Sequence, residues 1–126
     1  MRVQKGMFLL AMRSALNDVE RYEFEPYTYG PMSRALYGDV RALTRDGLLD
    51  AIPIEGAAWR LLALTPAGGK RAAALRRGAE RDRPDAIAEL ASIRSEISGL
   101  SFAELLQHVY DRYPDYAVRS VFRGAR

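Results

Sequence analysis

The sequence predicts a mainly α-helical fold with one small β-hairpin. Apolar residues recur at helical spacing through most of the 126 residues. Near the middle, two short apolar runs are separated by the four-residue turn Glu55 to Ala58, which is typical of a hairpin. The composition, 48% hydrophobic and 28% charged, is that of a globular chain that can bury a core.

The first helix is expected over residues 3–16, where apolar side chains occupy more than one face and predict burial on more than one side. Asn17 and Asp18 can end it. Residues 22–29 are rich in aromatic residues, and we expect them to be extended or to form a short irregular turn.

The second helix is expected over residues 33–46. Gly30 and Pro31 interrupt the chain before it, Ser33 suits its N-cap, and Gly47 suits its C-terminal stop. The two strands of the hairpin are expected over residues 48–54 and 59–64.

The remainder of the chain predicts helices. Thr65 is expected to cap a helix that has Pro66 in its first turn and runs to about residue 83. A further helix starts at residue 84, and Ser101 with Glu104 forms a capping box for a helix ending near residue 113. Residues 115–122 are expected to form one more short helix.

A helix followed directly by a two-stranded hairpin, after an earlier helix, is the order of a winged helix-turn-helix. We therefore predict a winged-helix domain over residues 1–83. Residues 84–126 would form a helical C-terminal extension that serves as a dimerisation element.

Several stretches resemble known bacterial families. The stretch from Phe24 to Ser33, which contains Tyr-Gly-Pro-x-Ser, resembles the central signature of YwgA-like proteins. It is also similar to a sequence pattern in the SocA-like Panacea domain. The tyrosine-rich segment 105–117 resembles the YwgA-like tail. Residues 39–49 resemble the recognition helix and first wing strand of PadR and MarR regulators, and residues 64–68 the strand-to-helix exit of many winged helices. The resemblance implies a fold of the DNA-binding type.

The charge is uneven along the chain and indicates where a polyanion would bind. The net charge is +3, yet residues 61–83 hold six basic and two acidic residues. On the 33–46 helix, Arg34, Arg41 and Arg45 fall within about 40° of one another, opposite the apolar side. The residues expected to contact double-stranded DNA are Ser33, Arg34, Tyr37, Arg41, Arg45, Arg60, Lys70, Arg77 and Arg81.

The function predicted is therefore a DNA-binding transcription regulator with helix 33–46 in the major groove. The alternative is a protein-interaction module, antitoxin-like or an adaptor, that binds a protein through residues 22–29 and its C-terminal helices. The turn at Gly56 favours this alternative, because it holds Glu55 and lacks a basic residue before Arg60.

A homodimer is also expected, since aromatic residues suit interface anchors. The residues predicted to form its interface are Leu105, Val109, Tyr110, Tyr113 and Tyr116.

Neither an enzyme, a cofactor nor a metal is expected. The absence of cysteine excludes thiolate zinc sites, and one histidine, His108, excludes a multi-histidine site within one chain. Glu104, His108 and Asp111 share a helix face, and we interpret them as a hydrogen-bonded surface set. No apolar run approaches the ~20 residues of a membrane span, and the N-terminus lacks a signal-peptide pattern, so a cytoplasmic location is expected.

Overall fold

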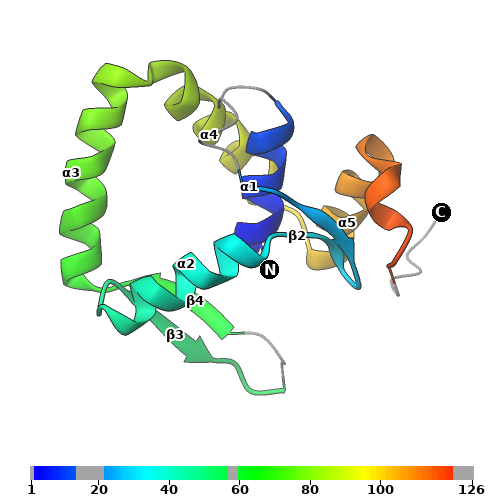
Figure 1. The fold of residues 1–126 in the computed structure, drawn as a ribbon, viewed down its shortest axis with the longest axis horizontal. Helices are drawn as coiled ribbons and strands as arrows, with labels where there is room; N and C mark the ends of the chain where they lie inside the picture. Colours follow the sequence, from blue (N-terminus) through cyan, green and yellow to red (C-terminus); the bar gives the residue numbers. More distant parts are fainter. Residues whose placement is uncertain (1, 14–21, 57–59, 121–126) are drawn as a thin grey trace. The chain divides into compact units, whose positions relative to one another are not determined.

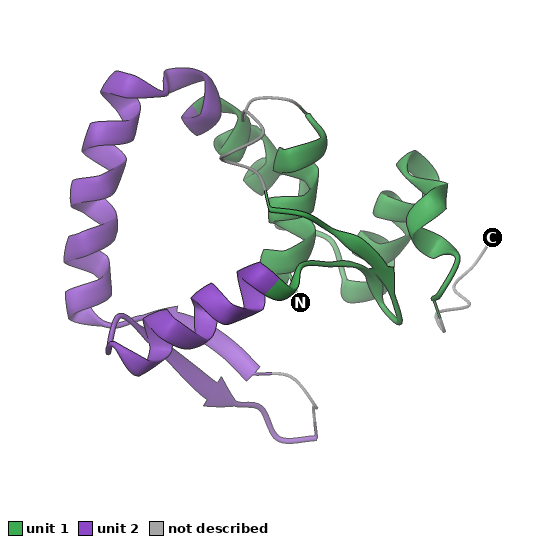
Figure 2. Ribbon diagram, viewed as in Figure 1, with its two compact units in different colours: residues 1–34, 88–126 green, residues 35–87 purple. Residues whose placement is uncertain are grey.

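A computed structural model describes residues 2–13, 22–56 and 60–120 of the chain (Figure 1). The fold is mainly helical, as the sequence predicts, and the described residues form two small two-stranded antiparallel sheets, of which the sequence predicts one. By their contacts the residues divide into two compact units, residues 1–34 with 88–126, and residues 35–87 (Figure 2). This division differs from the predicted one at residue 83, because the first helix shares a core with the C-terminal helices.

Unit 1 is built around the first helix. Its elements are α1 (Arg2–Met12), β1 (Glu25–Tyr27), β2 (Gly30–Met32), most of α4 (Pro84–Ile97), α5 (Phe102–Arg112) and the 3-10 helix η1 (Pro114–Ala117). The last part of the predicted 3–16 helix, with Asn17 and Asp18, lies outside the described residues.

The core of unit 1 lies between α1, α4 and α5. Phe8 is fully buried, and its ring meets Phe24, Tyr113 and Tyr116 edge to face at centroid distances of 5.4, 5.1 and 4.6 Å. The buried residues of this core are Phe8, Leu9, Leu10, Ile93, Ile97, Leu105, Leu106, Val109 and Tyr110.

The segment before α2 differs from the expected irregular stretch. Residues 25–27 and 30–32 pair as an antiparallel hairpin, with Pro26 opposite Pro31. Gly30 has φ +87°, and a Cβ there would lie 3.2 Å from the side chains of Leu106 and Lys5. The hairpin turn therefore requires glycine both for its backbone conformation and for its close approach to the core.

Unit 2 holds α2 (Arg34–Arg45) from its second residue, then β3 (Leu49–Pro53), β4 (Arg60–Leu64) and α3 (Pro66–Asp82). β3 and β4 form the predicted hairpin, with Leu49 opposite Leu64 and Ile52 opposite Leu61. Residues 57–59 of its connection lie outside the described residues.

The join between the hairpin and α3 is tightly specified. The Thr65 hydroxyl accepts a hydrogen bond from the Gly68 amide at 3.0 Å and donates one to the Gly47 carbonyl at 2.6 Å. A Cβ on Gly68 would lie 1.9 Å from the Leu48 carbonyl oxygen, so only glycine fits there. The predicted N-cap is confirmed, and it also ties the start of α3 to the turn after α2.

Of the C-terminal elements, the start of α5 agrees with the local signals in the sequence. Ser101 and Glu104 form the predicted capping box at the start of α5. The short helix predicted for residues 115–122 is wrong over the described residues: a 3-10 turn spans Pro114–Ala117, residues 118–120 are not helical, and residues 121–122 lie outside the described part. Of the described helices, none has the length and apolar character needed to cross a membrane.

Candidate nucleic-acid interface

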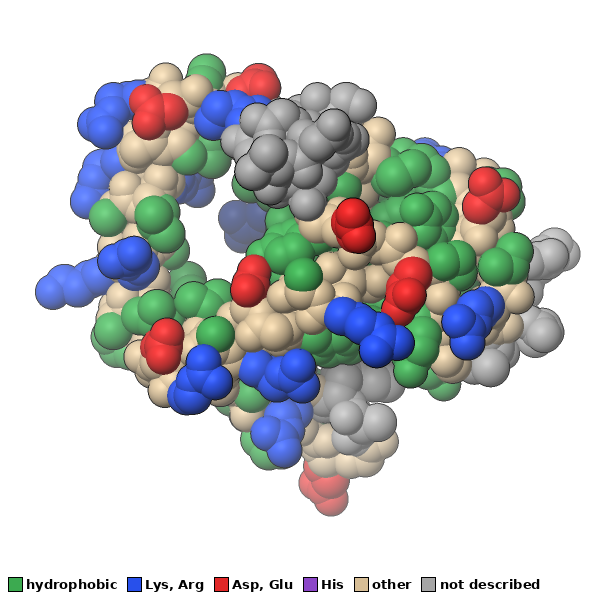
Figure 3. All heavy atoms as spheres, in the orientation of Figure 1, with side chains coloured by type: hydrophobic (Ala, Val, Ile, Leu, Met, Phe, Trp, Pro, Cys, Tyr) green, Lys and Arg blue, Asp and Glu red, His purple; other side chains and the backbone are tan. Residues whose placement is uncertain are grey.

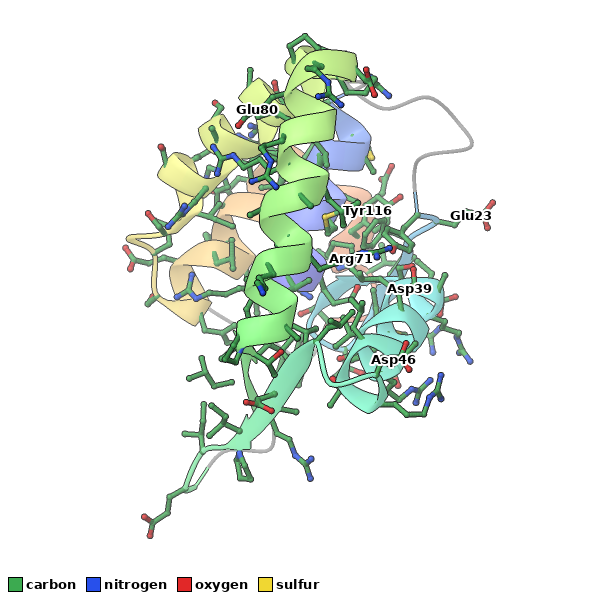
Figure 4. The ribbon with its side chains drawn as sticks, turned by 90° about the vertical axis from the view of Figure 1, so that its left-hand side faces the viewer. Glu23, Asp39, Asp46, Arg71, Glu80 and Tyr116 are labelled. Atoms are coloured by element: carbon green, nitrogen blue, oxygen red, sulfur yellow. The ribbon has the colours of Figure 1, made fainter. Side chains whose placement is uncertain are left out.

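The predicted arginine face of α2 is exposed. Arg41 and Arg45 lie in the solvent, while Leu36 on the opposite side is buried. No carboxylate among the described residues forms an ion pair with either arginine. Asp39 and Asp46 also stand on α2, as Figure 4 shows, but the helical repeat places them about 100° or more from the arginine stripe. The exposed stripe of α2 is therefore cationic.

Arg34 begins α2 and is already paired. Its Nε donates to the Glu25 carboxylate of β1 at 3.1 Å, and 81% of its side chain is exposed. An exposed pair of this kind contributes about 0–1 kcal/mol, so a phosphate could displace Glu25 without a large cost.

Ser33 is wrongly assigned as a DNA contact. It is 1% exposed, and its backbone amide and carbonyl bond the Gln4 side chain at 2.9 and 3.1 Å. The sequence signal of a helix N-cap is correct in position, but the residue lies inside unit 1 rather than on a surface.

Tyr37 and Arg60 are both exposed, in agreement with a contact role. Arg60 stands opposite Pro53 at the outer end of β4, and Glu55 and Gly56 come after the outer end of β3. One arginine and one glutamate near the tip give the hairpin little positive charge. The hairpin is therefore the weakest part of the candidate interface.

α3 carries the second basic stripe. The helical repeat places Lys70, Arg77 and Arg81 within about 40° of one another, and all three are exposed. On another side of the helix, Arg76 pairs with Glu80 at 2.9 Å. Figure 3 shows basic side chains along α3 and along α2, with a few acidic side chains interspersed among them.

The predicted dimer-interface residues are mostly core residues. Leu105 and Val109 are fully buried within unit 1, and Tyr110 is 7% exposed with its hydroxyl donating to Ser120 at 2.6 Å. Tyr113 and Tyr116 are half-buried against Phe8. The sequence correctly indicates an apolar face, but α1 of the same chain covers it, so Leu105, Val109 and Tyr110 are not available to a second copy.

The three polar residues considered on α5 have separate partners. Glu104 caps the helix, Asp111 accepts from Gln107 at 2.7 Å, and His108 Nε2 lies 3.2 Å from the Glu96 carboxylate. The described residues contain no group of three His, Asp or Glu side chains placed to hold a metal ion.

Two residues on α1 that hold the segment before α2, Gln4 and Lys5, were not predicted from the sequence. Gln4 bonds the Ser33 backbone, as described above. Lys5 is 2% exposed and donates from Nζ to the Pro31 carbonyl at 3.1 Å. Burial lowers the pKa of this amine from 10.5 to about 8. Together the two side chains hold the backbone that leads into α2. The sequence does hold a signal for their burial, because Gln4 and Lys5 directly precede an apolar run that is buried on several sides.

An aromatic pocket of about 290 Å³ lies in unit 1 next to the predicted protein-binding segment. Its lining comes from α1, the stretch before β1, and η1: Phe8, Ala11, Met12, Tyr22, Glu23, Phe24 and Tyr116. In Figure 4, Glu23 points outward, away from Tyr116. The pocket is therefore lined by aromatic rings rather than by converging charges.

Comparison with protein-family models, with curated proteins and with solved structures yields no match. The resemblance of residues 24–33, 39–49 and 105–117 to YwgA-like, PadR and MarR proteins thus stays a prediction from the sequence.

Proposed function

We propose that this chain is a non-enzymatic, DNA-binding transcription regulator of winged-helix type, with α2 lying in the major groove. The observation that carries the proposal is the exposed pair Arg41 and Arg45, which no described carboxylate neutralises, on the side of α2 opposite buried Leu36. The two arginines are four residues apart, about 6 Å along the helix axis, which suits adjacent base edges or a base and its flanking phosphate.

The order of elements in unit 2 supports the same proposal. A helix with an exposed basic face is followed by a two-stranded hairpin, and then by a helix with its own basic stripe. In this arrangement α2 would read bases, and Lys70, Arg77 and Arg81 on α3 would contact phosphates. Arg60 would add a phosphate contact from the hairpin.

Binding to duplex DNA across a salt series tests the proposal. We expect affinity to fall steeply with salt, because each phosphate contact releases counterions. Arg41→Ala should cost about 1–3 kcal/mol on a preferred sequence and less on random DNA. Arg77→Ala should weaken both alike and reduce the salt slope by about one.

Arg94→Ala is the matched control, because Arg94 is an exposed arginine on α4 in unit 1 and its loss changes the net charge equally. We expect it to leave DNA affinity nearly unchanged. No binding at low salt, or equal losses for Arg41→Ala and Arg94→Ala, would contradict the proposal.

A second candidate function is a protein-interaction module, and the aromatic pocket favours it. The pocket lies beside Tyr22 and Phe24, and Tyr27 and Tyr29 further along are more than two-fifths exposed. Rings of this kind supply large contact area at low entropic cost. If Phe24→Ala and Tyr29→Ala abolish capture of a protein partner while DNA binding is absent, this second function replaces the first.

A further inference from the structure

The outward face of the β3–β4 hairpin is apolar where a solvated face would be polar. Ile52 and Leu61 stand directly opposite each other, with 44% and 55% of their surfaces exposed. Ile54 comes two residues after Ile52 and is 40% exposed. Since side chains alternate along a strand, Ile52 and Leu61 project from the same side of the hairpin, and Ile54 continues that side just past the end of β3. We call these three residues the wing patch.

The helix that comes after the hairpin does not cover the wing patch. Its start is fixed at the base of the hairpin, where Gly68 meets the Leu48 backbone and Thr65 bonds the Gly47 carbonyl. From that base α3 and the hairpin extend in opposite directions, as Figures 1 and 4 both show. The wing patch, towards the tip, is therefore out of reach of α3 in the same chain.

α3 itself has an exposed apolar face. Leu75 is 61% exposed, the largest exposed fraction among the described leucines of unit 2. The helical repeat places Ala72 and Ala79 beside it and Arg71 one turn before it. Small side chains around one leucine make a flat surface that protruding isoleucine and leucine side chains can approach closely.

We propose that two copies of this chain associate through a reciprocal contact, in which the wing patch of each copy packs on the Leu75 face of α3 in the other. The charges on the two surfaces are complementary. Asp50 and Glu55 flank the wing patch, whereas Arg71 stands one turn before Leu75 on the face of α3 that would receive it. Packing of one wing on another would instead bring these carboxylates together.

The reciprocal arrangement closes on itself, because a two-fold axis makes both contacts identical. It also leaves the stripe of Lys70, Arg77 and Arg81 free, since the helical repeat places that stripe on the opposite side of α3 from Leu75. The association is thus independent of the proposed DNA binding, and each can fail without the other.

Sedimentation velocity over a concentration series tests the association. Leu61→Glu and Leu75→Glu should each weaken it by at least about tenfold, because each would bury an unpaired carboxylate. Val118→Glu is the matched control on unit 1, where Val118 is 74% exposed, and it should leave the association unchanged. A chain that stays monomeric at high micromolar concentration overturns the proposal.

Charge reversal identifies which surfaces meet. Glu55→Arg and Arg71→Glu should each weaken association, and the double variant Glu55→Arg/Arg71→Glu should restore it. Without restoration, the pairing of the wing with α3 is wrong.

Cysteine pairing gives an independent reading, because the chain has no cysteine of its own. Leu61→Cys mixed with Leu75→Cys should form a disulfide between the two different variants faster than either variant does alone. Preferential Leu61→Cys self-pairing would indicate wing-on-wing packing and overturn the reciprocal contact.

Discussion

Replacing Gly68 with alanine is the sharpest test of how unit 2 is assembled. The added Cβ would lie 1.9 Å from the Leu48 carbonyl oxygen and 2.9 Å from its carbonyl carbon. Both atoms belong to the backbone, so no side chain can rotate away to make room. The start of α3 must instead move by an ångström or more away from the turn after α2.

The cost comes from the contacts that this movement breaks. Overpacking typically costs about 1–3 kcal/mol. Strain on the Thr65 cap, which bonds both the Gly68 amide and the Gly47 carbonyl, adds about 1 kcal/mol. Alanine in a helix returns about 1 kcal/mol relative to glycine. We therefore expect Gly68→Ala to lower the free energy of unfolding by about 1–3 kcal/mol.

Gly69→Ala is the control, because it makes the same chemical change one residue later. Among the described residues, no atom that could clash lies within 4 Å of a Cβ at Gly69, so we expect a gain of about 0.5–1 kcal/mol from helix propensity. Urea unfolding followed by circular dichroism measures both variants, and amide exchange across the start of α3 localises the effect to unit 2. The reasoning is refuted if Gly68→Ala is as stable as Gly69→Ala.

Three further changes test unit 1 by its unfolding free energy. Between pH 8 and pH 10.5 the unfolded chain holds the proton that the buried Lys5 amine has lost, so the free energy of unfolding should rise by about 3 kcal/mol across this range. Lys5→Met should abolish that rise, and an unchanged pH dependence in the variant would contradict the prediction. Partial burial acts to raise the pKa of Glu96, but hydrogen bonds from Arg13 and His108 outweigh it and lower that pKa. Stability should therefore fall as pH drops through and below the usual glutamate range, and less so in Glu96→Gln, which an acid titration monitored by circular dichroism measures. Ser101→Ala should cost about 1 kcal/mol through loss of the capping box, and urea unfolding that shows no loss would exclude the cap as a stabilising feature.

Local signals in the sequence locate most of the elements. Thr65 with Pro66, and Ser101 with Glu104, predict helix starts because capping depends only on neighbouring residues. Gly47 ends α2 in the expected place, with φ +78°. The exposed side of α2 can also be predicted from the sequence, since helical periodicity alone separates Arg41 and Arg45 from Leu36.

The partner that covers each apolar face could not be predicted. Leu105 and Val109 lie on the face that periodicity indicates, yet their partner is α1 rather than a second copy, and only the tertiary structure decides between the two. The β1–β2 hairpin was missed because two prolines and a glycine are typical of a break in regular structure. A strand of three residues is too short to show an alternating apolar pattern. The β2 strand is also stabilised by a residue of another element, since Lys5 of α1 donates to the Pro31 carbonyl.

Packing largely accounts for the stretch of residues 24–33 that resembles YwgA-like proteins. Gly30 turns against Leu106, Pro31 accepts from Lys5, and Ser33 is held on both backbone groups by the Gln4 side chain. Each contact lies in unit 1 and fixes the chain where α2 begins. These contacts account for residues 24–33 only, whereas Arg41 and Arg45 lie in the stretch 39–49, whose resemblance to a recognition helix rests on the sequence alone. DNA binding must accordingly be decided on the arginine face of α2 itself, by comparing Arg41→Ala with the charge-matched Arg94→Ala.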